Sequence, residues 1–216
     1  MKTCLIISGG PVDREFAAEF LKGRTYDCII AVDAGLETAL GLGLTPTAAV
    51  GDFDTVKQEV FAWFNGQKGI EWDIHKPEKD ETDTELAFLT AMNEGCGAID
   101  VIGATGGRMD HTISNIHCLL PCLNRGVSAV LADEKNRIFL MDKGRTFKKS
   151  QCFGKYISFL PLTEQVKGIT LKGFKYPLTS RDIVIGPSLT TSNEIEAEEA
   201  VITFDEGILI CIQSRD

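Results

Sequence analysis

The stretch Val50-Gly51-Asp52-Phe53-Asp54-Thr55 joins a short apolar strand to a pair of acidic side chains. Because side chains alternate along a strand, we expect Asp52 and Asp54 to point the same way and Phe53 to pack into the core. Two neighbouring carboxylates raise each other's pKa, and a divalent cation such as Mg²⁺ removes that conflict. Taken alone, the stretch also fits an acidic turn, since Gly and Asp are common turn residues.

Apolar runs like the one before Asp52 recur through the first 132 residues and alternate with helical patterns. Asp13, for example, opens a pattern that places Phe16 and Phe20 on one face of a helix. Strands that alternate with amphipathic helices predict an α/β domain with a mostly parallel sheet and flanking helices. The expected strands are residues 3–7, 28–32, 50–55, 70–74, 99–102 and 127–131, and further helices are expected at 37–42, 57–64, 82–93 and 113–123.

The last of these helices carries an apolar stripe with the spacing i, i+3, i+7 and i+10. We expect that stripe to face the core. Its residues are Ile113, Ile116, Leu120 and Leu123.

The pattern changes after residue 132, where strand-like runs follow one another without helices of useful length. Asp205-Glu206-Gly207 is typical of a hairpin turn leading into a strand at 208–212. The second part of the chain is therefore expected to be an all-β domain, with the boundary between residues 132 and 133. Its other expected strands are 137–141, 156–160, 169–171 and 200–204.

Composition narrows the possible functions. The 216 residues carry a formal net charge of −9, which argues against a sequence-independent grip on nucleic acid, because such a grip needs clustered Lys and Arg. Seven cysteines without a CxxC pair favour reduced thiols in a cytoplasm. We expect no signal peptide and no membrane segment, since no apolar run is long enough.

Glycine-rich turns mark possible anion sites. Gly9 and Gly10 end the first strand, and backbone amides at such a turn can receive phosphate. The turn at 103–111 adds Arg108 and a helix N-terminus with polar side chains, which is an anion site in its physical make-up. The pattern GxxxxGK[ST] is absent, so a nucleotide would not bind as in a P-loop enzyme.

Acidic residues follow several of the same strands. Asp33 follows the second strand, Asp80 precedes the capping box Thr82-Asp83-Thr84-Glu85, and Asp83 lies within it. Two of these acids have an ordinary alternative, since Asp33 could cap a helix and Asp83 suits a first helical turn. Because carboxyl ends of parallel strands share one crevice, we expect these acids and the glycine turns to meet there. Carboxylates with Mg²⁺, amide donors and an Arg are the groups needed for phosphoryl transfer.

Five motifs follow one another over nearly the whole chain: VDAG at 32–35, GDFDT at 51–55, KDETDTELA at 79–87, GATGGRMDHTISN at 103–115 and TTSNE at 190–194. In this order they resemble the thiamine pyrophosphokinase family. The resemblance implies a Rossmann-like catalytic domain at 1–132, which binds nucleotide, and a thiamine-binding β-sandwich domain at 133–216, in a homodimer. It also implies transfer of the pyrophosphoryl group of ATP to the hydroxyl of thiamine, which gives thiamine diphosphate and AMP.

The resemblance also implies roles for individual residues. Asp52, Asp54 and Asp83 would hold Mg²⁺, with Asp80 close by, and Arg108 would neutralise charge as the thiamine hydroxyl attacks the β-phosphorus in line. Asp54 would orient or deprotonate that hydroxyl. The residues implied to receive ATP are Gly9, Gly10, Asp33, Thr105, Gly106, Gly107, Arg108, Asp110, His111 and Asn115.

The thiamine pocket of the family uses the β domain of the second subunit, which implies that Thr191, Ser192 and Asn193 lie beside thiamine, together with Asp54. From spacing alone, the same three residues fit a polar loop between strands. Both tryptophans, Trp63 and Trp72, precede residue 133, so an aromatic wall in the second domain would have to be Phe or Tyr. The acidic motif ends in Thr55 where the family usually has Ser.

Two other functions fit the same residues. One is pyrophosphoryl transfer to a different small alcohol, such as a pterin. The other is a regulatory module that binds a nucleotide and Mg²⁺ without turnover.

Overall fold

The computed structural model describes residues 1–75 and 80–216. The chain divides into two compact units, Met1–Glu134 and Lys135–Asp216. Residue 79, the first of the KDETDTELA motif, lies outside the described residues.

The first unit is built on a parallel sheet with the strand order β6-β5-β1-β2-β3-β4. Every neighbouring pair in this order runs parallel, which confirms the predicted α/β class. The interiors of the other strands are buried because helices cover both faces, as parallel sheets require, whereas the edge strand β4 is partly exposed. The strands are β1 (Lys2–Ile7), β2 (Cys28–Val32), β3 (Ala48–Gly51), β4 (Glu71–Ile74), β5 (Cys96–Ile102) and β6 (Ser128–Ala132).

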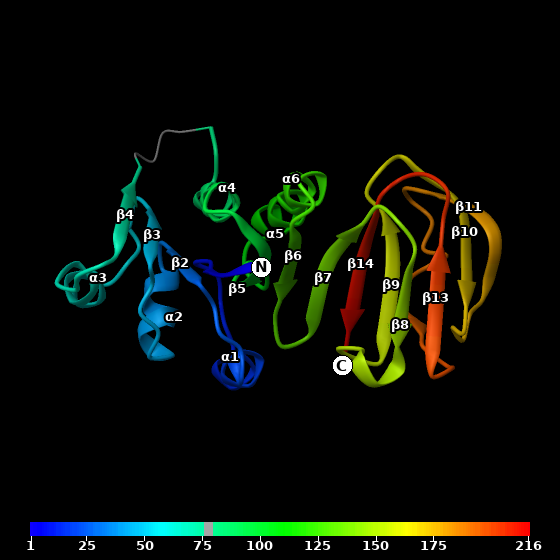
Figure 1. Ribbon diagram of the computed structural model, residues 1–216, viewed down its shortest axis with the longest axis horizontal. Helices are drawn as coiled ribbons and strands as arrows, with labels where there is room; N and C mark the ends of the chain where they lie inside the picture. The colour runs from blue at the N-terminus through cyan, green and yellow to red at the C-terminus, as the bar shows by residue number, and fades with distance from the viewer. Residues whose placement is uncertain (76–79) are drawn as a thin grey trace. The chain divides into compact units, whose positions relative to one another are not determined.

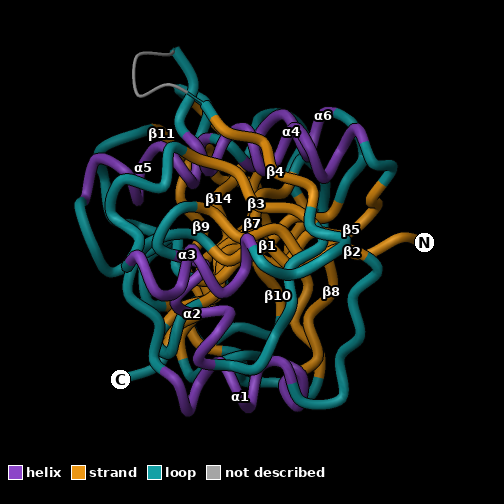
Figure 2. Tube along the Cα trace, turned by 90° about the vertical axis from the view of Figure 1, so that its left-hand side faces the viewer, coloured by secondary structure: helices purple, strands orange, loops and turns teal. Residues whose placement is uncertain are grey.

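Helices lie on both faces of this sheet, with α4 and α6 on one side and α1 and α2 on the other (Figures 1 and 2). Two predicted helix starts are confirmed: Asp13 accepts a hydrogen bond from the Phe16 amide at 2.7 Å, and Thr82 accepts one from the Glu85 amide at 3.2 Å. In the described ranges, no helix is both long and apolar enough to cross a membrane. The helices are α1 (Arg14–Leu21), α2 (Gly35–Gly41), α3 (Gln58–Asn65), α4 (Asp83–Asn93), α5 (Met109–His117) and α6 (Leu119–Asn124).

The long helix predicted through residue 123 is wrong, because the chain forms α5 and α6 with a break at Cys118. Pro121 explains the break: its ring clashes with the carbonyl four residues earlier, and α5 ends at that residue, His117. The break changes which side chains face inward. Ile113 is 48% exposed, and the expected stripe is replaced by the buried residues Asn115, Cys118, Leu119 and Cys122.

The second unit consists of antiparallel strands in the orders β12-β9-β14-β7 and β11-β10-β13-β8. Phe159 of β9 contacts Phe147 of β8 with ring centroids 6.0 Å apart, so side chains from the two groups of strands share one core. In this part of the chain the structure describes one helical segment, a 3₁₀ turn at Lys149–Gln151. The strands are β7 (Asn136–Met141), β8 (Arg145–Lys148), β9 (Tyr156–Pro161), β10 (Gln165–Lys172), β11 (Leu178–Val184), β12 (Asn193–Glu194), β13 (Glu199–Thr203) and β14 (Leu209–Ser214).

The hairpin predicted at Asp205-Glu206-Gly207 is wrong. β13 pairs with β10 and β8, whereas β14 pairs with β7 and β9, so this segment carries the chain from one set of strands to the other. Its backbone is bonded to Lys167 of β10, through the Lys167 amide to Glu206 O and the Asp205 amide to Lys167 O, both at 2.9 Å. These distant partners, and not the local turn residues, decide the path.

Candidate active site

A cleft of about 620 Å³ opens in the first unit at the carboxyl ends of β1, β2 and β5. Most of the predicted ATP and acidic residues line it, while Asp52, Asp54, Asp80, Gly106 and Asp110 are not part of its lining. The site residues that line the cleft are Gly9, Gly10, Asp33, Asp83, Thr105, Gly107, Arg108, His111 and Asn115. The lining residues that were not among the predicted site residues are Ser8, Pro11, Val32, Ala34, Thr55, Glu81, Thr82, Thr84, Gly103, Ala104 and Thr112.

The two glycine turns of the cleft pack directly on one another. The Gly10 amide donates to Gly103 O at 2.9 Å, and a Cβ at Gly10 would collide with that oxygen. Pro11 lies against Gly106 and Gly107, where added Cβ atoms would meet its ring at 3.3 and 3.6 Å. The glycines therefore allow the ends of β1 and β5 to approach closely and form one floor.

Thr105 and Asn115 hold this floor in place from the far side. The buried Asn115 Nδ2 donates to Ala104 O at 2.8 Å, and Thr105 Oγ1 donates to Asp133 Oδ2 at 2.5 Å. These polar groups already have partners within the protein. Both side chains thus shape the turn that a ligand would meet.

Arg108 provides a positive charge at the N-terminus of α5. Its Nη2 lies 2.6 Å from Asp110 Oδ2, and both side chains are exposed. The hydrogen bond from Arg108 lowers the pKa of Asp110 to about 2, and the carboxylate in turn raises the pKa of Arg108. Because the guanidinium has five donors, it can keep this contact and still receive a phosphate oxygen.

The acidic motif is a turn and not the strand predicted through Thr55. β3 ends at Gly51, Phe53 has a φ of 58°, and the Asp54 amide donates to Asp52 Oδ1 at 3.1 Å. The charge of Asp52 is nevertheless the largest cause of the raised pKa of Asp54. The two acids remain electrostatic neighbours, although by a turn and not by strand alternation.

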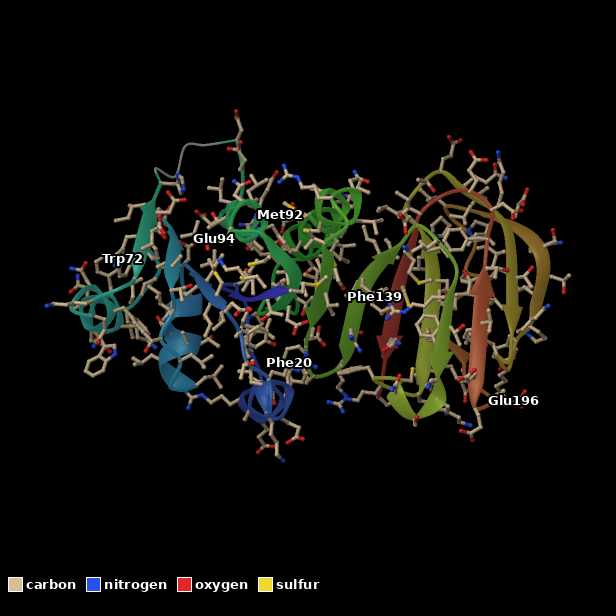
Figure 3. The ribbon with its side chains drawn as sticks, viewed as in Figure 1. Phe20, Trp72, Met92, Glu94, Phe139 and Glu196 are labelled. Carbon is tan, nitrogen blue, oxygen red and sulfur yellow. The ribbon has the colours of Figure 1, made fainter. Side chains whose placement is uncertain are left out.

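Phe53 packs into the core, as predicted. It is 8% exposed, and its ring centroid lies 5.3 Å from that of Trp72 and 5.6 Å from that of Phe61. Figure 3 shows Trp72 on β4, the strand that receives this cluster. The aromatic packing anchors the middle of the acidic turn.

Asp33 does not cap α2. The cap residue of α2 is Ala34, which makes no side-chain bond, and Asp33 itself has a φ of 45°. Its Oδ1 accepts a hydrogen bond from the Phe53 amide at 3.3 Å. Burial, followed by the charge of Asp83, raises the pKa of Asp33 to about 6, and the charge of Asp52 adds to this effect. Negative charge is therefore concentrated at the ends of β2 and β3.

Asp52 and Asp54 line a second pocket of about 380 Å³, next to Phe53 and Phe61, while Asp83 lines the main cleft. The expected single crevice is thus two pockets. Within residues 1–75 and 80–216, no three His, Cys, Asp or Glu side chains form a ready-made metal-ligand group. Asp52, Asp54 and Asp83 nevertheless offer carboxylate oxygens, the ligands that Mg²⁺ prefers. Mg²⁺ is commonly held by one or two carboxylates together with phosphate.

Ser8 and Thr84 were not among the predicted site residues. Their buried hydroxyls lie 2.7 Å apart and connect β1 to the first turn of α4, beside Asp83. Their positions, directly before Gly9 and directly after Asp83, were the available signal.

In the second unit, Asn193 is buried and its amide group is fully used. Its Oδ1 accepts from the Tyr176 amide at 3.0 Å, and its Nδ2 donates to Tyr176 O at 2.8 Å. Thr191 and Ser192 are exposed, and the Ser192 amide donates to Ser158 Oγ at 2.9 Å. Asn193 therefore supports a surface loop whose tip is Thr191 and Ser192.

Comparison with known proteins agrees with this arrangement. Residues 23–131 match the family described as "Thiamin pyrophosphokinase, catalytic domain", and residues 145–209 match "Thiamin pyrophosphokinase, vitamin B1 binding domain". The chain is 34% identical to thiamine pyrophosphokinase of Bacillus subtilis (strain 168) over 223 residues, with all of both chains covered.

Solved structures give the same result. The crystal structure of thiamine pyrophosphokinase from Bacillus subtilis superposes with a TM-score of 0.89 at 33% identity, covering all of both chains. That of thiamin pyrophosphokinase from Geobacillus thermodenitrificans gives a TM-score of 0.85 at 32% identity and covers 99% of this chain and 98% of the other. From its two matched domains, its full-length relative and its fold, the chain belongs to the thiamine pyrophosphokinase family.

Proposed function

We propose that this enzyme transfers the pyrophosphoryl group of ATP to the hydroxyl of thiamine and releases thiamine diphosphate and AMP. Membership of the family supports formation of thiamine diphosphate by pyrophosphoryl transfer. The observation that carries the proposal is the 620 Å³ cleft, which combines the glycine floor and Arg108 with the carboxylate of Asp83, a proposed metal ligand. Donors for phosphate and a carboxylate for a cation thus line the same cleft.

The triphosphate of ATP is proposed to lie over the glycine floor. Backbone amides near Gly9, Gly10 and Gly107 and the N-terminus of α5 offer hydrogen bonds and positive dipole ends to phosphate oxygens. Arg108 and His111 line the same cleft. Arg108 would neutralise charge that develops on the transferred group.

Mg²⁺ is the proposed metal, with Asp52, Asp54 and Asp83 as its protein ligands. Support comes from the donor chemistry and from the neighbouring carboxylates, which are the main cause of the raised pKa of Asp54 and which add to burial in raising the pKa of Asp33. When bound, Mg²⁺ would supply positive charge to the phosphate oxygens.

Asp54 is proposed to orient the thiamine hydroxyl and to accept its proton. The hydroxyl oxygen forms a bond to the β-phosphorus while the bond from that phosphorus to the bridging oxygen of AMP breaks. The neighbouring charge of Asp52 raises the pKa of Asp54, which makes its carboxylate a better proton acceptor.

Thiamine recognition is proposed to involve Thr191, Ser192 and Asn193 from the second subunit of a homodimer, together with Asp54. The match of residues 145–209 to the vitamin B1 binding domain supports a role for the second unit in binding thiamine. We also propose a reducing compartment such as the cytoplasm, since all seven cysteines are free thiols.

The test is incubation of purified protein with MgATP and thiamine, followed by separation of nucleotides. We expect thiamine-dependent AMP, whereas ADP would indicate transfer of a single phosphoryl group. If AMP forms with a pterin alcohol and not with thiamine, the acceptor is the pterin alcohol. Nucleotide binding without any turnover would favour the regulatory module.

A further inference from the structure

Asp33 lies where β2 ends, next to the turn that carries Asp52 and Asp54. Its backbone amide donates to Val50 O at 3.2 Å, and its Oδ1 accepts from the Phe53 amide at 3.3 Å. The main chain and the side chain of Asp33 therefore both form hydrogen bonds with the chain at the end of β3.

Gly51 is shaped around the same carboxylate. Its φ is 144°, a conformation that side chains rarely adopt, and a Cβ at this position would collide with Asp33 Oδ1. Because Gly51 has no side chain, the Asp33 carboxylate can reach the Phe53 amide.

The turn that results is not one the local sequence favours. Phe53 is an aromatic residue with a φ of 58°, which is uncommon and persists only where the surroundings impose it. Two contacts impose it here: the ring packs on Phe61 and Trp72, and the amide donates to Asp33. The first contact fixes the ring and the second fixes the backbone that carries the acids.

We propose that Asp33 is a positioning residue, whose carboxylate accepts the Phe53 backbone amide and thereby sets the places of Asp52 and Asp54 on either side of it. The sequence had suggested instead that Asp33 contacts the nucleotide. The consequence for turnover rests on the proposed function, whereas the effect on the turn does not. A carboxylate that already accepts the Phe53 amide and lies close to the charges of Asp83 and Asp52 is better suited to hold a turn than to meet phosphates.

Asp27 gives a matched control, because its carboxylate also accepts a backbone amide, at the opposite end of β2. Its Oδ2 accepts from the Thr3 amide of the neighbouring strand at 2.8 Å. Asp27→Ala thus removes a comparable carboxylate-to-backbone bond away from the cleft.

The experiment measures hydrogen exchange at the Phe53 amide, together with kcat and KM for ATP. Losing one such hydrogen bond should change an equilibrium by about tenfold. We therefore expect Asp33→Ala to speed exchange at Phe53 by about tenfold and to lower kcat by about tenfold or more, with KM for ATP changed less than about twofold. Asp33→Asn keeps an acceptor oxygen and should restore much of the protection. Asp27→Ala should leave Phe53 exchange and kcat unchanged.

A rise in KM for ATP with unchanged Phe53 exchange would overturn the proposal and make Asp33 a nucleotide contact. Equal effects of Asp27→Ala and Asp33→Ala on kcat would also overturn it. If Asp33→Ala does not fold, Gly51→Ala decides, since it displaces the carboxylate from the other side: unchanged Phe53 exchange in that variant sinks the proposal. Failure of the wild-type enzyme to form AMP from ATP and thiamine would reject the proposed function, while the exchange measurements still report on Asp33.

Discussion

The hydroxyls of Ser8 and Thr84 lie 2.7 Å apart, both buried, and join the end of β1 to the first turn of α4. Ser8 directly precedes the glycine turn, and Thr84 directly follows Asp83. One hydrogen bond therefore connects the proposed phosphate floor to the proposed metal ligand. Because a buried hydroxyl without a partner is costly, this bond fixes the spacing between the two sides of the cleft.

Replacing Thr84 with Val removes the hydroxyl and keeps the side-chain shape. The Ser8 hydroxyl is then buried without its partner, so we expect a loss of about 1–3 kcal/mol in the free energy of unfolding. The measurement is urea denaturation followed by circular dichroism. Thr90→Val on the same helix is the control and should change stability by less than about 0.5 kcal/mol. Equal losses in the two variants would contradict a special role for the Ser8–Thr84 bond.

Replacing Phe53 with Ala should destabilise the first unit by about 3–5 kcal/mol, since it removes a buried ring that packs on Phe61 and Trp72. Trp63→Ala is the control, because Trp63 is 57% exposed and its loss leaves no internal cavity. Denaturant unfolding of both variants checks the prediction. If Trp63→Ala lowers the free energy of unfolding as much as Phe53→Ala, burial of the Phe53 ring is not the reason for the loss.

The pKa of Asp110 reports on Arg108. NMR titration should give a value of about 2 in the wild-type enzyme, and in Arg108→Ala the pKa should return towards its ordinary value of 3.8. Since the folded-state pKa is lowered, the contribution of this pair to stability is present above pH 4 and is lost as the pH falls towards 2. Both side chains are exposed, so the effect on stability is expected to be small. An unchanged pKa in the variant would show that Arg108 is not the cause.

Substitutions at Asn193 and Ser192 should distinguish a structural role in the second unit from a role in binding thiamine. Asn193→Ala leaves the Tyr176 backbone groups without their partner, and we expect it to lower the free energy of unfolding by about 1–3 kcal/mol. Ser192 is exposed, so Ser192→Ala should raise KM for thiamine while leaving stability within about 0.5 kcal/mol of wild type. Steady-state kinetics and thermal unfolding measure the two effects. A stable Asn193→Ala enzyme would rule out its structural role.

Features that depend on nearby residues could be predicted from the sequence. The caps at Asp13 and Thr82 form hydrogen bonds only three residues along the chain, and both were predicted correctly. The alternation of apolar strands with helices correctly indicated a parallel sheet in the first unit. Three strands, β8, β11 and β12, were not predicted, since their sequences are largely polar and exposed apart from a few residues.

Features that depend on distant partners could not be predicted in the same way. The stripe from Ile113 to Leu123 assumed one helical phase, which Pro121 interrupts. The path after β13 is decided by Lys167, far earlier in the chain, and not by Asp205-Glu206-Gly207. Turn residues indicate where a chain bends but not which strand it then pairs with.

The acidic stretch at Gly51 to Thr55 contains both kinds of information. Residue types and their order along the chain predicted that two carboxylates would stand close together after a buried strand and that Phe53 would face the core. The turn at Gly51 could not be predicted from them, because that conformation depends on the carboxylate of Asp33, eighteen residues earlier, and on the ring of Trp72, twenty-one residues later. Backbone conformations that are unfavourable in isolation exist only where such distant contacts stabilise them.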